Sequence, residues 1–99
     1  NMPETMYRAS RCCRILGNPT AYLILRFLGA NRRTPTQISQ GIQVTLPAAS
    51  VTLRQLRNLD LVRYETRGNT KEYWVKDRGV LQIMSALETW ARTMRKKRL

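Results

Sequence analysis

The most reactive side chains in the sequence are the adjacent thiols of Cys12 and Cys13, in a 99-residue chain that contains no histidine. Without histidine, the chain cannot use a Ser-His-Asp or Cys-His mechanism or bind zinc through imidazole. Two thiols are too few for a four-thiolate zinc site or a disulfide scaffold. The six acidic residues form no spaced pair typical of acid–base catalysis. We therefore expect no enzyme, no metal site and no cofactor.

The two cysteines fall in a predicted helix, where neighbouring Cα atoms lie about 3.8 Å apart, too close for an ordinary disulfide. Cys13 continues an apolar helical stripe and is expected to pack. Cys12 lies on the flank of that stripe, one turn from Arg8, whose charge favours a reactive thiolate. Cys12 is thus a candidate redox site that could bridge two subunits; the alternative is an inert thiol.

Charge is the strongest compositional feature, because 18 Lys and Arg residues oppose six Asp and Glu residues and give a net charge of +12. Such an excess has no folding rationale and indicates a polyanionic partner. A hydrophobic content of 42% indicates a folded domain. No apolar run approaches the roughly 20 residues of a membrane span, and no secretory signal follows Met2, the expected natural start. We expect one domain over residues 1–99, in the cytoplasm of a prokaryote and associated with its nucleoid.

Hydrophobic spacing divides the chain into helices and two strands. Asn18, Thr34 and Thr45 are typical N-caps, and a proline follows each of them within two residues. The change to β-branched and aromatic residues after residue 60 predicts a hairpin around Gly68. The expected elements are helices over 4–16, 19–28, 35–42, 46–59 and 80–95 and strands over 61–66 and 71–76. The fold class is mainly α with a small antiparallel hairpin, in the order α-α-α-α-β-β-α.

The segment from 34 to 59 is typical of a helix-turn-helix, and the hairpin over 61–76 would form a wing beside it. The second helix of such a pair enters the major groove of DNA. The sequence resembles winged helix-turn-helix transcriptional regulators of the ArsR (arsenical-repressor-like) type over roughly residues 10–90. The matching pieces are Leu16-Gly17-Asn18-Pro19-Thr20, Leu23-Ile24-Leu25 with Leu28, Ile38-Ser39 with Ile42, Ala49-Ser50 with Leu53 and Leu56, Leu61-Val62 and Gly68.

The sequence departs from that family's pattern at four places. Ala21 stands where the family usually has arginine, and Val51-Thr52 stand where it has a basic residue and then histidine. Gln43 occupies a turn position that is often glycine. The ligands of the metal-sensing members are absent, so the resemblance does not imply metal sensing, and the effector, if there is one, is unknown.

The helix over 46–59 has one face opposite its apolar stripe, and its candidate base-reading residues are Pro47, Ala48, Val51, Thr52 and Gln55. Gln55 has the geometry to bind adenine, whereas the methyl groups of Val51, Ala48 or Thr52 suit a thymine methyl. The candidates for contacts to the DNA backbone are Arg32, Arg33, Arg54, Arg57, Asn58, Arg67 and Lys71. For any single arginine among them, a solvated surface position is the alternative.

Both terminal helices carry an apolar stripe, and the ArsR resemblance implies that such helices form a homodimer. The candidate interface residues are Met6, Ala9, Cys13, Val80, Ile83, Met84, Leu87, Trp90, Ala91 and Met94. Packing on the domain's own core is the alternative for the last helix. We expect a homodimeric, sequence-selective regulator that binds double-stranded DNA. The alternatives are an architectural DNA-binding protein of low specificity and an RNA-binding protein. A basic tail, Arg95-Lys96-Lys97-Arg98, closes the chain.

Overall fold

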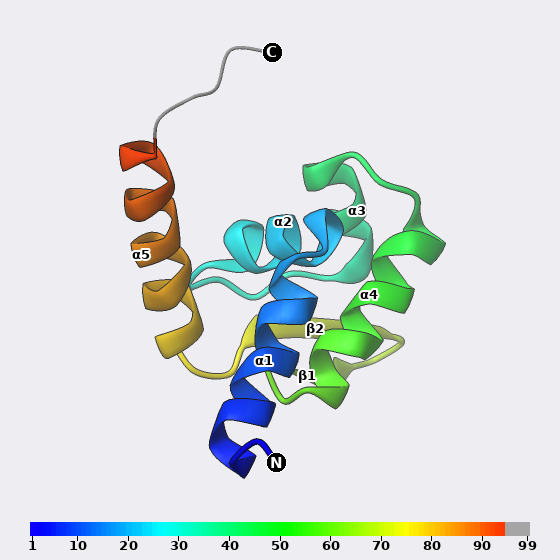
Figure 1. Cartoon of the computed structure of the whole chain (residues 1–99). Helices are drawn as coiled ribbons and strands as arrows, with labels where there is room; N and C mark the ends of the chain where they lie inside the picture. Colours follow the sequence, from blue (N-terminus) through cyan, green and yellow to red (C-terminus); the bar gives the residue numbers. More distant parts are fainter. Residues whose placement is uncertain (95–99) are drawn as a thin grey trace.

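The structure, a computed structural model, describes residues 1–94; the predicted tail over 95–98 lies outside the described residues. The order α-α-α-α-β-β-α is confirmed (Figure 1). The elements are α1 (Glu4–Leu16), α2 (Pro19–Leu28), α3 (Pro35–Ile42), α4 (Leu46–Asn58), β1 (Val62–Arg67), β2 (Thr70–Val75) and α5 (Gly79–Thr93). None of the helices within residues 1–94 is long and apolar enough to span a membrane.

Three helices begin at the capping residues that the sequence predicts. Asn18 Oδ1 accepts a hydrogen bond from the Ala21 amide at 3.0 Å, and Thr45 Oγ1 accepts one from the Ala48 amide at 3.2 Å. Thr34 and Gln37 form a reciprocal capping box at the start of α3. Each cap satisfies amides that the first helical turn leaves without a partner, so the sequence fixes where α2, α3 and α4 begin.

The reversal between α3 and α4 depends on Gln43. Gln43 has φ 59° and ψ 51°, in the left-handed region, and the Val44 amide donates to the Ser39 carbonyl at 3.0 Å. Glycine adopts this conformation without a steric penalty, which explains why glycine suits the position. The turn sets the angle at which α4 leaves α3.

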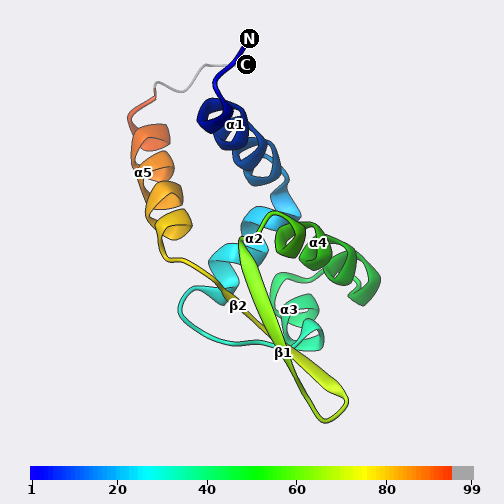
Figure 2. The same ribbon diagram turned by 90° about the horizontal axis from the view of Figure 1, so that it is seen from below.

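The hairpin is antiparallel, with Val62 opposite Val75 and Arg67 opposite Thr70. Relative to the prediction, β1 begins and ends one residue later, and β2 begins and ends one residue earlier. Arg67 and Thr70 still pair, which leaves a turn of two residues. Gly68 in that turn has φ 60°, a value that glycine tolerates. Arg33 and Tyr73 also exchange backbone hydrogen bonds of 3.0 and 2.8 Å. Figure 2 shows the hairpin projecting from the helices, with its tip far from α1 and α5.

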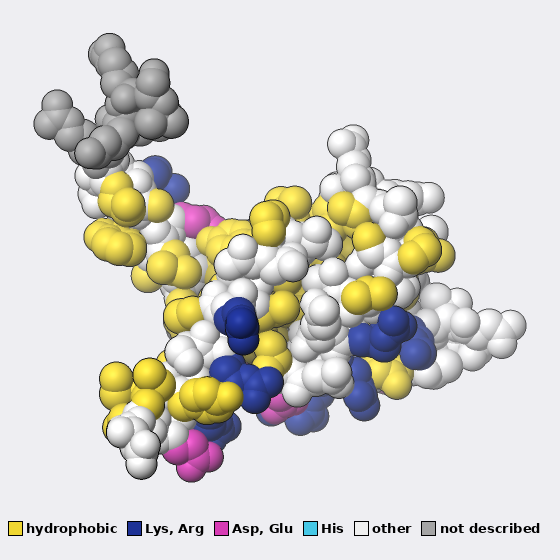
Figure 3. Space-filling model, turned by 45° about the vertical axis from the view of Figure 1, so that its right-hand side comes forward, with side chains coloured by type: hydrophobic (Ala, Val, Ile, Leu, Met, Phe, Trp, Pro, Cys, Tyr) yellow, Lys and Arg dark blue, Asp and Glu magenta, His cyan; other side chains and the backbone are white. Residues whose placement is uncertain are grey.

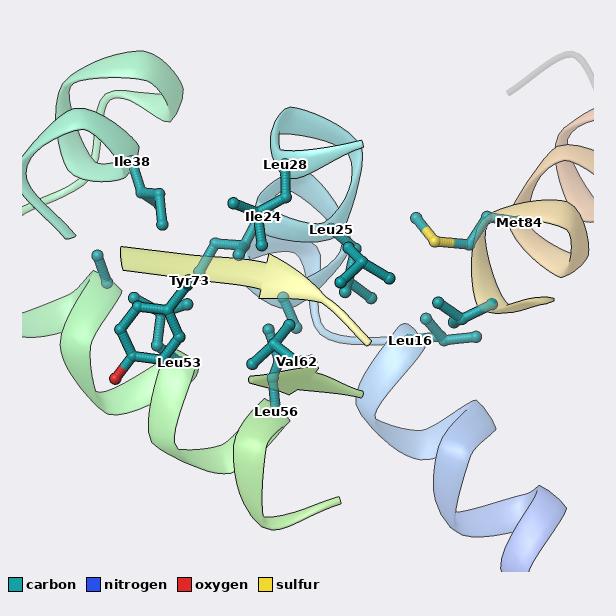
Figure 4. Close-up of a cluster of buried hydrophobic side chains, with 14 residues drawn as sticks. Leu16, Ile24, Leu25, Leu28, Ile38, Leu53, Leu56, Val62, Tyr73 and Met84 are labelled. Atoms are coloured by element: carbon teal, nitrogen blue, oxygen red, sulfur yellow. The ribbon is translucent and has the colours of Figure 1, made fainter. Parts of the chain in front are cut away.

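The core is built around α2, as its apolar sequence predicts. Ala21, Ile24, Leu25 and Leu28 are fully buried, and Figure 4 shows α4, α3 and the hairpin converging on them. The other buried apolar residues are Leu16, Ile38, Ala49, Leu53, Leu56, Val62, Tyr73, Val75, Val80 and Met84. The core thereby fixes α4 and the hairpin relative to one another.

Helix α5 corrects one prediction, because Val80 and Met84 are buried and belong to the core instead of an interface. Ile83, Leu87, Trp90 and Met94 remain exposed. The helix therefore carries two neighbouring apolar faces, and periodicity alone merges them into one stripe.

A polar cluster also joins α5 to α2. The Tyr22 hydroxyl donates to Glu88 Oε2 at 2.5 Å, and Arg26 Nε donates to the same oxygen at 2.8 Å. The hydrogen bond from Tyr22, followed in size by the one from Arg26, holds the pKa of Glu88 below its usual value. The same bond to the carboxylate raises the pKa of Tyr22. The cluster fixes the direction of α5 relative to the core.

Candidate nucleic-acid interface

Helix α4 has a buried face on the core and a face that the described residues leave uncovered. Ala49, Leu53 and Leu56 are fully buried. The uncovered side consists of Pro47, Ala48, Val51, Arg54, Gln55, Arg57 and Asn58, all exposed. Val51 at its centre is 45% exposed. An uncovered helix face of this length is what insertion into the major groove requires.

Thr52 does not belong to this face, which corrects the sequence-based assignment. Its side chain is only 7% exposed, and its hydroxyl donates to the Ala48 carbonyl at 3.0 Å. That bond to the preceding turn satisfies the hydroxyl within the helix, and little of the residue is accessible to solvent. Thr52 is therefore not available to a thymine methyl.

Cations flank α4 on the side of the hairpin. The guanidinium carbon of Arg57 lies 5.0 Å from the ring centre of Tyr64, and Lys71 Nζ lies 4.7 Å from the same ring. The centre of the Tyr64 ring lies 5.1 Å from the centre of the Tyr73 ring. Tyr73 is buried, and its burial raises the pKa of its hydroxyl group. Stacking on a fixed aromatic ring orders long cationic side chains. Arg57 and Lys71 are thus brought together, although the sequence separates them by a whole strand.

Arg67, next to the hairpin turn, is 70% exposed. Its Nε atom lies 3.5 Å from Glu72 Oε1 and 3.9 Å from Glu65 Oε1. Exposed pairs of this kind contribute at most about 1 kcal/mol. The guanidinium group of Arg67 therefore exchanges these carboxylates for another anion at little cost.

Arg32 and Arg33 lie at the base of the hairpin. Arg32 forms an ion pair with Glu65, and its guanidinium carbon lies 3.9 Å from the ring centre of Trp74. Arg33 is half-buried and bonds to Tyr73 through its backbone. Both residues thus hold the segment before α3 against the hairpin, a structural role that the sequence does not reveal.

Two more cations lie on the opposite side of α4, and sequence reasoning missed them. Arg11 and Arg14 of α1 line a hollow of about 460 Å³ together with Ile15, Asn18, Gln55, Asn58 and Leu59. Figure 3 shows Lys and Arg side chains over α1 and continuing toward α4. In the sequence, Arg11 and Arg14 lie away from the apolar stripe of α1, and this position could have indicated that they are available to a partner. Gln55 accordingly lies on the α1 side of the exposed face.

Comparison with solved structures identifies the fold. A homodimeric winged helix-turn-helix DNA-binding domain from Mycobacterium bovis, a possible ArsR-family transcriptional regulator, has a TM-score of 0.79 over 89% of this chain and 82% of that one, at 22% identity. This chain has the winged helix-turn-helix fold.

Two further solved structures share it. HlyU from Vibrio cholerae has a TM-score of 0.80 at 21% identity, covering 90% of this chain and 97% of its own. NolR from Sinorhizobium fredii has a TM-score of 0.79 at 24% identity, with 87% and 86% covered. No family model and no curated protein matches the sequence. At these identities the likeness confirms the winged helix-turn-helix fold; α3 and α4 as the helix pair and the hairpin as the wing stay predictions.

In this winged helix-turn-helix structure, α1 and α5 present an exposed apolar surface away from the wing. Met6 and Tyr7 on α1 are 58% and 53% exposed, and Trp90 on α5 is 63% exposed. Ala9 and Ala91 are exposed as well. Single exposed apolar residues are ordinary in proteins, whereas several on the same two helices are candidates for contact with a partner. Every predicted interface residue except Val80 and Met84 thus has an exposed side chain.

A largely apolar hollow of about 500 Å³ lies between α1 and α5. Its lining includes Cys12, Cys13, Leu61 and Ile83, with the carboxyl groups of Asp60 and Asp77 also present. Bonding to Lys76 lowers the pKa of Asp60. The two thiols are free, and Cys13 is exposed whereas Cys12 is half-buried, the reverse of the order that the sequence suggests. The redox role of Cys12 stays a prediction.

Proposed function

We propose that the protein is a transcriptional regulator that binds double-stranded DNA with sequence selectivity, by occupancy and without catalysis. The observation that carries the proposal is the uncovered face of α4, which begins at the Thr45 cap and has cations on both flanks. In this proposal α4 is the recognition helix in the major groove, and the wing contacts the backbone or the minor groove. The site of action is the prokaryotic nucleoid.

Base reading is assigned to the exposed residues Pro47, Ala48, Val51 and Gln55. The Val51 and Ala48 methyl groups are suited to thymine, and the Gln55 amide is suited to adenine N6 and N7. Arg54, Arg57, Asn58, Arg67 and Lys71 hold the phosphate backbone. Arg32 and Arg33 act from the base of the wing, where Arg32 also remains paired with Glu65.

The active form is proposed to be a homodimer in which a second copy covers the outer faces of α1 and α5. The exposed apolar residues Met6, Ile83, Leu87, Trp90 and Met94 supply the contact. Twofold dimers are the commonest homo-oligomers, and a twofold axis places two recognition helices in successive major grooves about 34–36 Å apart. The M. bovis domain with the same fold is itself homodimeric.

One observation favours a second candidate, an architectural protein that coats DNA with little sequence preference. Pro47, Ala48 and Val51 provide no hydrogen-bond donor to a base edge, and the net charge is +12. Methyl contacts and DNA shape would then carry whatever selectivity exists. The two candidates differ in their preference for one duplex over another, which regulators typically show at 10³-fold or more.

Titration of a fluorescent duplex and of an RNA hairpin over a range of salt concentrations tests DNA binding. For a dimer with 6–10 phosphate contacts, counterion release predicts a loss of affinity of roughly 10³–10⁵ between 50 and 200 mM salt. The duplex should bind more tightly than the RNA, because within residues 1–94 the winged face offers α4 and not a platform of exposed aromatic rings. A flat salt dependence or a preference for RNA contradicts the proposal.

A further inference from the structure

The hollow between α1 and α4 has the composition of an anion site. The residues that border it include the guanidinium-bearing Arg11 and Arg14 and the amide-bearing Asn18, Gln55 and Asn58. None of the described residues that line it is acidic. Guanidinium forks and amide groups donate hydrogen bonds to phosphate oxygens, and arginine does so with two parallel bonds.

Arg11 and Arg14 are among the cations of residues 1–94 that form no ion pair. Within residues 1–94, Arg26, Arg32, Arg63, Arg67 and Lys76 each form an ion pair, whereas neither Arg11 nor Arg14 does. The contact of Arg11 is with the Tyr7 ring, whose centre lies 5.9 Å from its guanidinium carbon. Two like charges around one hollow repel each other, and a bound anion would relieve that repulsion.

The position of the hollow identifies that anion. Arg57 lies over Tyr64 on the wing side of α4, whereas Gln55 and Asn58 face α1 across the hollow. A helix in the major groove has a phosphodiester backbone on each side, about 12 Å apart. In the proposed complex the wing contacts the backbone on one side, and on the other side Arg11 and Arg14 border the hollow beside α4.

We infer that Arg11 and Arg14 of α1 bind phosphodiester groups of the same duplex, on the side of α4 opposite to the wing. The inference rests on the proposed function and deepens it. Helix α1 then has two roles on two sides, because Met6, Ala9 and Cys13 lie on a different side of the helix from these arginines. Dimerisation through that apolar side leaves both guanidinium groups accessible, so each subunit clamps both backbones around its recognition helix.

The test compares the salt dependence of duplex binding for the wild type, R11Q/R14Q and the control R78Q/R92Q. The control removes the same charge at the N-cap and in the last turn of α5, a helix on the opposite side of the molecule from α4 (Figure 1). The slope of log affinity against log salt is negative, and each lost phosphate contact makes it shallower by about 0.9, so the loss of four arginines per dimer should make it shallower by about 3 to 4. R78Q/R92Q should keep the wild-type slope. Circular dichroism and light scattering should show that both variants are folded dimers.

A second measurement uses duplexes in which single phosphates are replaced by neutral methylphosphonates. On the wild type, neutralising the phosphates beside the recognition helix on the α1 side should weaken binding; on R11Q/R14Q the same replacement should have no effect. If R11Q/R14Q keeps the wild-type slope and the wild-type methylphosphonate pattern, the inference is wrong and the proposed function stands. If the wild type itself binds duplexes without salt dependence, both are wrong.

Discussion

Nε of Arg26 lies 2.8 Å from Oε2 of Glu88, and this ion pair connects the central helix α2 to the terminal helix α5. Tyr22 donates to the same carboxylate oxygen. One buried side of α5, around Met84, and this half-exposed cluster together orient the helix. The orientation of the proposed dimer surface on α5 therefore depends on residues of α2, the central helix of the winged helix-turn-helix core.

Glu88→Gln should lower the free energy of unfolding at neutral pH and should change its dependence on acid. The pKa of Glu88 is lowered in the folded state, so its carboxylate stabilises the protein above the ordinary glutamate value of 4.5. This contribution disappears as the pH falls through the lowered pKa. Urea unfolding at a series of pH values should show the wild-type advantage shrinking in acid. Glu4→Gln, far from the cluster, is the control, and parallel pH curves for wild type and Glu88→Gln would contradict this account.

Gln43→Gly should stabilise the protein. Gln43 adopts a left-handed conformation that costs a non-glycine residue about 1–2 kcal/mol, part of which the greater freedom of glycine in the unfolded chain cancels. The expected net gain is about 0.5–1 kcal/mol, which thermal unfolding reports as a rise of a few degrees in Tm. Gln40→Gly, inside the preceding helix α3, should instead destabilise the protein by about 1 kcal/mol. A lower Tm for Gln43→Gly would show that the turn is not strained.

Local features of this fold could be predicted from the sequence because their causes lie within a few residues. Asn18, Thr34 and Thr45 each satisfy the amide three positions ahead, so the starts of α2, α3 and α4 were predicted correctly. The change of hydrophobic period placed the hairpin within one residue. The position of Gln43 at the turn was also predicted.

Features that depend on long-range packing could not be predicted in this way. Periodicity assigned Val80 and Met84 to the same stripe as Trp90, although the first two pack on α2 and the core. Thr52 looked like part of the exposed face because its inward hydrogen bond to Ala48 has no sequence pattern of its own. The hollow that joins Arg14 to Gln55 exists only once α1 lies beside α4.

Leu87→Glu combined with Trp90→Glu should convert the proposed homodimer to a monomer. Both side chains are exposed on the outer side of α5, so in the monomer the glutamates remain in water, whereas in the dimer they would be buried without partners. Light scattering at several concentrations measures the molecular mass. Leu23→Glu, at an exposed leucine on α2, is the control and should remain dimeric. A wild-type monomer, or a double variant that stays dimeric, would contradict the assigned interface.

Of two substitutions at adjacent positions, Val51→Ala should change base preference and Thr52→Val should not. The Thr52 side chain is buried, so Thr52→Val should leave the preferred DNA sequence unchanged. Val51 is exposed at the centre of the face, so Val51→Ala should weaken discrimination at one base pair by about 1 kcal/mol. Competition with duplexes that differ at single positions measures both effects. Lost preference in Thr52→Val with none in Val51→Ala would reverse the assignment of the α4 face.

Selection of bound duplexes from a random-sequence pool, followed by the affinity of the selected site relative to a scrambled one, tests the central claim most directly. Sequence-selective binding by a twofold dimer predicts a near-palindromic site with half-sites about one helical turn apart. It also predicts a preference of about 10³-fold or more over the scrambled duplex. No enrichment, or a preference below about tenfold, would contradict the regulator assignment and favour the architectural alternative.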